Sequence, residues 1–299
     1  MTAAYTVSSV IDSVHTRFEQ ADLYYGHGTD NAWDEAVSLV LTVAGIEDSR
    51  DNLELELPIG LVTDIVDLAE LRISRRWPLP YILGRCTYMG LEFKLKPGVV
   101  VPRSPIGYLL SEGLEPYLPS RVEKIVDLCS GSGCLGILAG LQYPGAELVL
   151  VDNSELACET AKINLELHGL SDRSRILNTD VLGEDVAVEL SNADLILCNP
   201  PYVNHEDMQD LPAEYRAEPE AGLAAGEDGL DIFSPLLQTL LNEMAAGATF
   251  VGEVGDSGEA LSAAFPDIPL TWLDLPFGGR GVFVLEARKL TSHTAPASS

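Results

Sequence analysis

The spacing of apolar and polar positions changes at about residue 106, so the chain has two regions of different pattern. Beyond that point, short apolar runs alternate with longer segments whose apolar residues recur at helical spacing. This alternation predicts a doubly wound, mostly parallel β-sheet, and the two last runs are expected to form an antiparallel pair. The strands are predicted at 124–129, 146–152, 174–180, 193–198, 248–255, 270–276 and 281–287, and the helices at 105–118, 135–144, 154–170 and 229–247.

The first 85 residues have helical spacing without clear strand patterns. A helix-capping residue, Asp30 or Asn31, precedes one amphipathic segment, and Gly45 is a typical stop for it. We therefore expect a small N-terminal helical domain, and we expect it to help select a substrate because it shows no chemistry of its own. Its clearest helices are predicted at 31–46 and 58–76.

A β-hairpin is predicted between the two regions. Leu91, Phe93 and Leu95 alternate with polar residues, and Pro97-Gly98 is a typical turn dipeptide ahead of a valine run. The hairpin is expected to act as a linker or hinge, and the polar end of the chain is expected to be a disordered tail. The predicted division is thus 1–85 helical, 86–105 hairpin and hinge, 106–289 α/β domain and 290–299 tail.

The charge of the chain is strongly acidic, with 46 Asp and Glu against 18 Lys and Arg and a net charge of −28. Such a chain should repel nucleic acid phosphates and attract a basic protein, although adaptation to a salty cytoplasm also explains the excess. We find neither an apolar run long enough to cross a membrane nor a signal peptide at the N-terminus. Five cysteines without a C-x-x-C spacing favour a reducing, cytoplasmic location and indicate no metal site.

A glycine-rich loop follows the first strand of the α/β region, where residues 126–136 read VDLCSGSGCLG. Gly131, Gly133 and Gly136 allow a tight turn and a close approach of the backbone to a ligand. Asp152 ends the next strand, where an acid can bind the ribose hydroxyls of a nucleoside. The order of strand, loop, helix, strand and acid predicts a site for an adenosine-bearing cofactor, and this motif alone leaves a dinucleotide possible.

Two further acids favour S-adenosyl-L-methionine over a dinucleotide. Asp127 lies within the end of the strand, where it can receive a positively charged α-ammonium group that a pyrophosphate does not supply. Asp180 ends the third strand, where a carboxylate can accept a hydrogen bond from an adenine amino group. The alternative for Asp180 is a structural role as a cap or turn residue.

The sequence Cys198-Asn199-Pro200-Pro201-Tyr202 comes directly after the fourth predicted strand. Two prolines cannot continue a central strand, because they lack backbone donors and have fixed φ angles. They form a rigid corner that displays the asparagine and the tyrosine at the strand end. A simple strand terminator remains the alternative when this motif is taken alone.

These motifs together resemble the class I S-adenosyl-L-methionine-dependent methyltransferases that modify planar amide or amino nitrogens. This group includes glutamine amide methyltransferases of the HemK/PrmC type and adenine-amino DNA methyltransferases. The resemblance covers nearly the whole chain, including segments 78–106 and 214–231. It implies a Rossmann-like catalytic domain whose cofactor contacts are Asp127, Cys129, Ser130, Gly131, Ser132, Gly133, Asp152, Asp180, Val181 and Asn199.

The hinge indicates a branch within the glutamine methyltransferases. Residues 102–106 read P-R-S-P-I where release-factor enzymes usually carry P-R-P-E-T-E, and this form, with residues 24–36, is similar to the PrmB branch. That branch implies methylation of a glutamine in large-subunit ribosomal protein three, with release factors as the alternative substrate. One departure is Cys129, where these enzymes commonly have glycine; cysteine is small, so the loop is still expected to close.

The resemblance also implies a mechanism without a histidine or lysine base. Asn199 Oδ1 and the carbonyl of Pro200 are expected to accept the two N–H groups of the substrate amide. Pro201 is expected to hold that carbonyl rigid, and Tyr202 to stack on the amide and face the cationic sulfonium. Rival interpretations are a DNA adenine methyltransferase, which the net charge disfavours, an NAD-dependent oxidoreductase and a non-catalytic cofactor-binding assembly protein.

Overall fold

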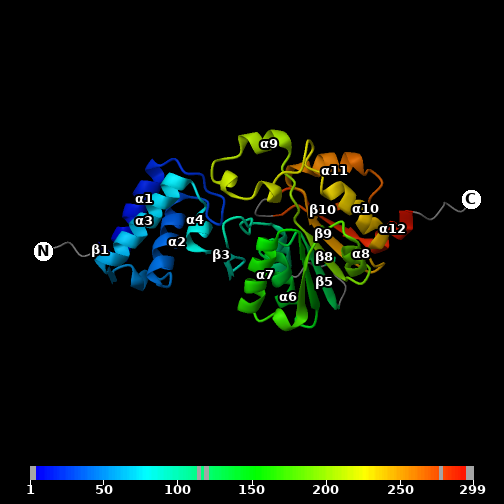
Figure 1. The fold of residues 1–299 in the computed structure, drawn as a ribbon, viewed down its shortest axis with the longest axis horizontal. Helices are drawn as coiled ribbons and strands as arrows, with labels where there is room; N and C mark the ends of the chain where they lie inside the picture. Colours follow the sequence, from blue (N-terminus) through cyan, green and yellow to red (C-terminus); the bar gives the residue numbers. More distant parts are fainter. Residues whose placement is uncertain (1–4, 113–115, 118–120, 276–278, 294–299) are drawn as a thin grey trace, which may run out of the picture.

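The computed structural model describes residues 5–112, 116–117, 121–275 and 279–293. A mixed β-sheet forms the centre of its α/β part (Figure 1). Within these residues the sheet has seven strands in the order β10-β11-β9-β8-β5-β6-β7. The strands from β5 to β9 pair in parallel, whereas β11 runs antiparallel to β9 and β10, so both sheet predictions are confirmed. The bounds are β5 Lys124–Leu128, β6 Glu147–Asp152, β7 Ser174–Asn178, β8 Leu195–Cys198, β9 Thr249–Glu253, β10 Thr271–Trp272 and β11 Val282–Glu286.

Helices cover both faces of this sheet (Figure 1). Successive strand residues point to opposite faces, so Ile125 packs in one core and Val126 in the other. Burial on both sides explains why the strands are nearly continuous apolar runs. On the first face lie α5 (Ile106–Ser111), α6 (Cys134–Gln142) and α7 (Glu155–Leu167), and on the second α8 (Glu184–Leu190), α10 (Phe233–Glu243) and α11 (Gly258–Ala264).

The N-terminal helices pack around a core of their own, to the left of the sheet in Figure 1. Asn31 caps the second helix by accepting the N–H of Asp34 at 2.9 Å, and Gly45 ends that helix at φ 66°. The helical pattern of this region is therefore confirmed, while a domain boundary at residue 85 stays a prediction. The elements are β1 Tyr5–Thr6, α1 Val7–Gln20, α2 Ala32–Ala44, β2 Glu56–Leu57, α3 Ile59–Arg75 and α4 Leu79–Leu83.

The hairpin exists, but the predicted position of its turn is wrong. Strands β3 (Arg85–Tyr88) and β4 (Leu91–Lys94) pair around Met89 and Gly90, which both have positive φ. Two positive φ values match the twist of paired strands. The Pro97-Gly98 dipeptide does form a turn, because the N–H of Val99 donates to the C=O of Lys96 and Gly98 has φ 96°. This turn follows β4 and does not connect the two strands of the hairpin. The valines at 99–101 instead line the cavity described below.

Two predicted ends also differ from the structure. The helix predicted at 105–118 is described as a helix over Ile106–Ser111, and positions 113–115 and 118 lie outside the described residues. The predicted tail at 290–299 is wrong in its first part, because Ala287–His293 forms α12. Glu286 fixes the start of this helix by pairing with Lys289 at 2.5 Å. The prediction for 294–299 falls on residues that the structure does not describe.

A buried ion network joins the N-terminal helices to the segment that follows β8. Arg72 of α3 donates to Glu35 of α2 at 2.5 Å and to Glu214 Oε1 at 3.2 Å. Arg76 pairs with the same oxygen at 3.0 Å, and the backbone N–H of Tyr24 donates to it at 3.1 Å. Glu214 and Arg72 are almost fully buried, so these bonds replace water for Arg72 and for Glu214 Oε1, whereas Glu214 Oε2 has no partner among the described residues.

Glu218 makes the matching connection to the hinge. Its Oε1 accepts from the backbone N–H of Val101 and from Arg103, both at 2.7 Å, and His27 Nε2 lies 3.5 Å from its Oε2. Burial opposes ionisation, but His27 and Arg103 hold the pKa of this carboxyl below its usual range. The Arg103 guanidinium also lies 5.1 Å from the ring centre of Tyr215. We call Glu214, Tyr215 and Glu218 the interdomain clamp.

We predict that Glu214→Ala lowers the free energy of unfolding by about 3 kcal/mol, because it leaves Arg72 buried with an incomplete set of partners. The measurement is the urea midpoint at constant slope. Glu220→Ala, which removes an exposed acid from the same segment, is the matched control and should change little. An unchanged midpoint for Glu214→Ala would show that the clamp does not stabilise the chain.

Cys129 occupies a backbone conformation that disfavours side chains, with φ 55° directly after β5. A non-glycine residue in this left-handed region costs roughly 1–2 kcal/mol. Glycine has no Cβ and carries no such penalty, so the cysteine fits the loop only at a cost in stability.

We predict that Cys129→Gly raises the free energy of unfolding by roughly 0.5–1 kcal/mol, because relief of the strain exceeds the added entropy of the unfolded chain. The matched control is Cys129→Ala, which removes the thiol but keeps the Cβ and should give no gain. If both variants change the free energy of unfolding equally, the change comes from loss of the thiol and not from relief of backbone strain.

Candidate active site

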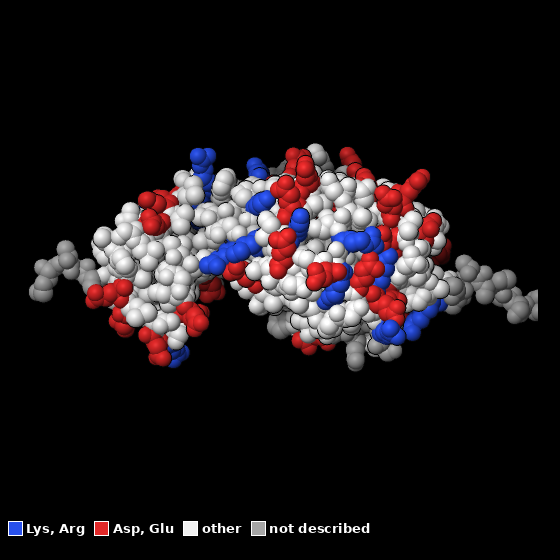
Figure 2. Space-filling model, turned by 60° about the horizontal axis from the view of Figure 1, so that its bottom comes forward, with Lys and Arg blue, Asp and Glu red and all other residues white. Residues whose placement is uncertain are grey.

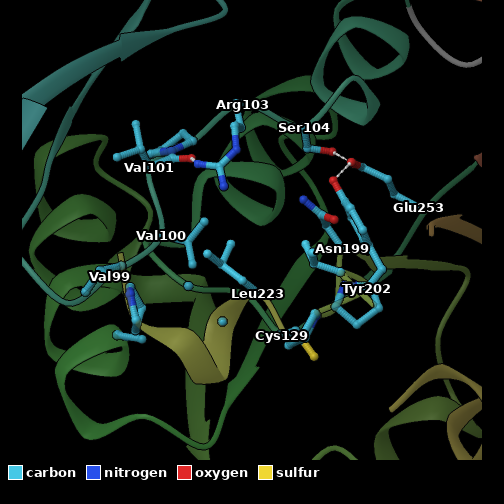
Figure 3. A pocket seen from close by; sticks show the side chains of 18 of the residues that line it. Val99, Val100, Val101, Arg103, Ser104, Cys129, Asn199, Tyr202, Leu223 and Glu253 are labelled. Carbon is cyan, nitrogen blue, oxygen red and sulfur yellow. Dashed lines mark hydrogen bonds between the residues drawn. The ribbon is translucent and has the colours of Figure 1, made fainter. Parts of the chain in front are cut away.

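A cavity of about 770 Å³ opens at the carboxyl ends of the parallel strands (Figure 3). Strand order reverses between β5 and β8, and ligands of open α/β sheets bind at such a switch point. The walls come from the hinge (98–105), the glycine loop (129–135), the corner after β8 (199–203) and the end of β9 (253–256). Segments far apart in the sequence thus meet at one site.

The glycine loop connects β5 to α6 and divides its residues between the cavity and the core. Gly131, at φ 55°, lines the cavity together with Ser130 and Ser132, and their contact with a cofactor stays a prediction. Gly133, at φ 80°, is not among the lining residues and faces the core, where an added Cβ would lie 3.0 Å from Leu150. Its contribution is to let the helix start close against β6.

Asp127 lines the cavity as a buried carboxylate. Its Oδ2 accepts the N–H of Gly136 at 2.8 Å, whereas its Oδ1 has no hydrogen-bond partner within the described residues. Burial raises the pKa of this carboxyl to about 7, the Gly136 bond opposes the shift, and the charge of Asp152 adds to it. A buried acceptor without a partner at the cavity wall fits a cationic group of a ligand.

Asp152 lies at the end of β6 and lines the same cavity. Its Oδ2 accepts the N–H of Gly131 at 2.8 Å, and its Oδ1 accepts the N–H of Ser154 at 2.9 Å. The pKa of this carboxyl is raised, because the effect of burial is larger than that of the two hydrogen bonds, which lower it. Each oxygen keeps a second lone pair, so Asp152 can hold the glycine loop and still accept bonds from two ribose hydroxyls.

Asp180 and Val181 form the wall beyond β7. Asp180 is exposed, and its Oδ1 accepts the N–H of Leu182 at 2.9 Å, which is the turn role considered above. Both residues nevertheless line the cavity, with Val181 buried and the exposed Leu182 beside it. This wall offers apolar contact to a flat ring together with one acceptor at its rim.

The corner after β8 has the form that the two prolines predict. The strand ends at Cys198, and Asn199, Pro200, Pro201 and Tyr202 all line the cavity. Asn199 Oδ1 is buried, and among the described residues it has no hydrogen-bond partner. A carbonyl-type acceptor left open in this way is suited to an N–H donor of a bound substrate.

Tyr202 is tied to residues that the sequence analysis missed. Its hydroxyl donates to Glu253 Oε1 at 2.8 Å, and Ser104 Oγ donates to Glu253 Oε2 at 2.5 Å, as the dashed lines in Figure 3 show. Burial raises the pKa of Tyr202 well above its usual value, as does the neighbouring Glu253. The available signal was the acid that ends β9, placed like Asp127 and Asp152 at the ends of their strands.

Further lining residues were also missed because they come from distant segments. Tyr24 reaches the cavity from the N-terminal region, Tyr215 from the interdomain clamp, and Arg103 from the hinge. His205 does not line this cavity; it is exposed and its Nε2 lies 3.0 Å from the Gln209 amide nitrogen. It is thus a surface histidine in this structure.

The arrangement fits the parts of S-adenosyl-L-methionine. Asp127 with its open oxygen suits the α-ammonium, Asp152 the ribose, and the wall at Asp180 and Val181 the adenine. A metal fits less well, because the described residues contain no group of three or more His, Cys, Asp or Glu able to hold an ion. In the same part of the chain, no helix is long and apolar enough to cross a membrane.

Comparison with solved structures relates the fold to methyltransferases. The catalytic domain of hMettl16, in complex with hairpin 6 of the MAT2A 3′UTR, superimposes with a TM-score of 0.51 at 14% identity, covering 81% of this chain and 87% of that one. At this identity the likeness concerns the fold alone. The family model "Methyltransferase small domain" matches residues 109–215, which include the glycine loop and the corner after β8.

Curated relatives are much more similar and extend over nearly the whole chain. The ribosomal protein uL3 glutamine methyltransferase of Bordetella pertussis is 38% identical over 96% of this chain and 97% of its own length. The protein of the same name from Francisella tularensis is 37% identical over 91% of this chain and 87% of its own length. Likeness at this level over full length shows common descent, and the chain therefore belongs to the family of the ribosomal protein uL3 glutamine methyltransferases.

Proposed function

We propose that the chain transfers a methyl group from S-adenosyl-L-methionine to the side-chain amide nitrogen of a glutamine in ribosomal protein uL3. The observation that carries this proposal is the buried Asn199 Oδ1, which lines the cavity and lacks a partner among the described residues. A glutamine amide presents two N–H donors in one plane, and this acceptor matches one of them. The names of the relatives support uL3 as the protein substrate.

The cofactor half of the site is formed by the ends of β5 and β6. Asp127 would hold the ammonium group of the cofactor, and Asp152 would hold its ribose. Gly131, which Asp152 fixes through its N–H, would let the backbone of the loop approach the cofactor closely. When bound, S-adenosyl-L-methionine supplies a methyl group on a sulfonium centre that is open to attack by a nucleophile. The protein contributes no redox or metal chemistry in this proposal.

The acceptor half is formed by the ends of β8 and β9. Asn199 Oδ1 and the carbonyl of Pro200 accept the two N–H groups of the glutamine amide, and Pro201 keeps that carbonyl fixed. The amide nitrogen is a weak nucleophile because its lone pair is delocalised, so orientation matters more than activation. Holding the reacting atoms about 3–3.5 Å apart in line contributes on the order of 7–11 kcal/mol.

Tyr202 presents its ring to the acceptor, and its hydroxyl is already committed to Glu253. The ring can stack on the planar amide and face a positive charge, worth roughly 0.5–2 kcal/mol. None of the described lining residues is a histidine or lysine, so no base of that kind takes the amide proton in this scheme. The proton leaves after transfer, when the methylated nitrogen is far more acidic.

The acidic surface supports a basic protein substrate over a nucleic acid. Figure 2 shows Asp and Glu side chains scattered over both the N-terminal helices and the catalytic part on the face in view. A net charge of −28 attracts a ribosomal protein and repels phosphates. We propose that the N-terminal helices help select the substrate, because Tyr24 extends from them into the cavity, and that the reaction occurs in the cytoplasm.

We predict that the purified chain transfers label from radiolabelled S-adenosyl-L-methionine to a glutamine of unmethylated uL3, with the site mapped by mass spectrometry. Asn199→Ala should lower kcat by at least about 100-fold, since a misplaced acceptor loses in-line geometry. Binding of S-adenosylhomocysteine, measured by calorimetry, should weaken far less than kcat falls, because Asp127 and Asp152 are unchanged and Asn199 is only one of the implied cofactor contacts.

Other outcomes of this assay assign the substrate differently. Label on a peptide-chain release factor alone would keep the chemistry and replace uL3 as the substrate. The absence of label on both proteins, with intact cofactor binding, would favour a non-catalytic role in ribosome assembly. Full activity of Asn199→Ala would remove this residue from the acceptor site.

We also predict that cofactor affinity depends on pH through Asp127, whose pKa burial raises to about 7. A bound ammonium group needs the ionised carboxylate, so below about pH 7 a proton must leave and affinity falls by up to about tenfold per pH unit. Calorimetry with S-adenosylhomocysteine in buffers of different ionisation enthalpy measures the released proton.

Asp127→Asn is the matched variant, because it keeps the size and the acceptor oxygen but cannot ionise. It should bind more weakly at neutral pH and should lose the acid-side dependence. If the wild-type affinity is flat down to about pH 5.5, Asp127 is not the ammonium partner.

A further inference from the structure

Tyr202 is held at several points by the residues that end β9. Its hydroxyl donates to Glu253, and its backbone carbonyl accepts from Ser257 Oγ at 3.3 Å. Between these contacts, Gly255 at φ 51° lies directly against the ring, since an added Cβ there would be 2.5 Å from the ring carbon Cε2. The segment 253–257 therefore contacts the hydroxyl, the ring edge and the backbone of Tyr202.

Glu253 also connects this tyrosine to the hinge. Its second oxygen accepts from Ser104 Oγ, and that hydroxyl oxygen accepts the N–H of Ile106 at 3.2 Å. The backbone carbonyl of Ser104 in turn accepts the hydroxyl of Tyr88 at 2.5 Å. Each end of the carboxylate thus meets a group whose own position is fixed by further bonds.

The burial of Glu253 has no explanation in the packing of the sheet. Only 3% of this residue is exposed, and its neighbours on β9, such as Val251, are apolar core residues. A buried carboxylate is costly unless it is well hydrogen-bonded, and an apolar residue would fill the strand end at lower cost. The carboxylate is therefore best explained by what it holds, namely Tyr202 on one side and Ser104 on the other.

We propose that Glu253 is a positioning residue that orients the Tyr202 ring toward the substrate amide, with Ser104 fixing the carboxylate in turn. This proposal rests on the proposed function, in which the ring of Tyr202 faces the acceptor. The hydroxyl of Tyr202 then serves as an anchor and takes no part in proton transfer. Without the carboxylate, the ring can rotate about its side-chain bonds, and the acceptor amide loses one wall of its site.

We expect the loss of Glu253 to lower kcat without weakening the binding of the cofactor. Glu253 and Tyr202 lie on the β8 and β9 half of the cavity, whereas Asp127 and Asp152 lie on the β5 and β6 half. Glu253→Ala should thus lower kcat with uL3 by up to about 100-fold through misplacement of the ring. The dissociation constant of S-adenosylhomocysteine should change by less than about twofold.

The conservative variant separates positioning from folding. In Glu253→Gln the amide oxygen can still accept the Tyr202 hydroxyl, and the Ser104 hydroxyl can accept from the new amide nitrogen. This variant should recover most of the lost turnover. Glu286→Gln is the matched control, because Glu286 is a buried acid at the far end of the neighbouring strand β11 and should leave kcat unchanged.

A double-mutant cycle tests whether the effect passes through the hydroxyl bond. Tyr202→Phe keeps the ring and removes its anchor, so its loss of kcat should not add to that of Glu253→Ala. Independent losses that multiply in the double variant would overturn the proposal. So would a kcat within about twofold of wild type for Glu253→Ala, given the size expected for a misplaced group.

A spectroscopic measurement tests the position of Tyr202 without an activity assay. With 3-fluorotyrosine incorporated into the full chain, the ¹⁹F resonance missing in Tyr202→Phe identifies this residue. Glu253→Ala should shift or broaden that resonance, while Glu286→Gln should not. If the wild-type protein methylates no tested protein, the proposed function fails, but a shifted resonance in Glu253→Ala still shows that Glu253 anchors Tyr202. If the resonance does not move, Glu253 does not anchor Tyr202 and the inference is overturned.

Discussion

The parallel pairing of β5 with β8 is the constraint on which the whole site depends. Leu128 and Cys198 are partners in this ladder, so the residues that follow them leave the sheet side by side. One chain then forms the glycine loop and the other forms the corner with Asn199. Because strand order reverses at this pair, the space above it is open and the cofactor half and the acceptor half share one cavity.

Carboxylates end several strands around this cavity, and their surroundings give them different tasks. Asp127 keeps one oxygen without a partner in the described part of the chain, so it can meet a cation. Asp152 accepts the backbone N–H of Gly131 in the glycine loop with one oxygen and the backbone N–H of Ser154, at the start of α7, with the other. Glu253 uses both oxygens on hydroxyl groups of other segments. A carboxylate can thus bind a ligand, support a loop or position another side chain, according to which donors surround it.

The sequence predicted the parts of this structure whose signals are local. Strand runs, the helix cap at Asn31, the glycine loop and the rigid corner all depend on residues near in sequence, and the structure has them. The hairpin turn was misplaced because Pro97-Gly98 has the stronger turn composition, although Met89 and Gly90 have the geometry that paired strands need. Glu253 and the interdomain clamp were missed because their partners lie far away along the chain and no periodic pattern records such contacts.

The hinge is the place where the selection of a substrate and the chemistry can meet. Arg103 turns toward Glu218 of the interdomain clamp, and its neighbour Ser104 turns toward Glu253 and thus Tyr202. The clamp segment returns to the corner through hydrogen bonds between Val203 and residues 223 and 225. Of these adjacent hinge residues, Arg103 bonds to the clamp, which contacts the N-terminal helices, and Ser104 bonds to Glu253, which accepts the Tyr202 hydroxyl. A P-R-S-P hinge is consequently more than a spacer, because a proline in place of Ser104 would remove the donor that Glu253 accepts.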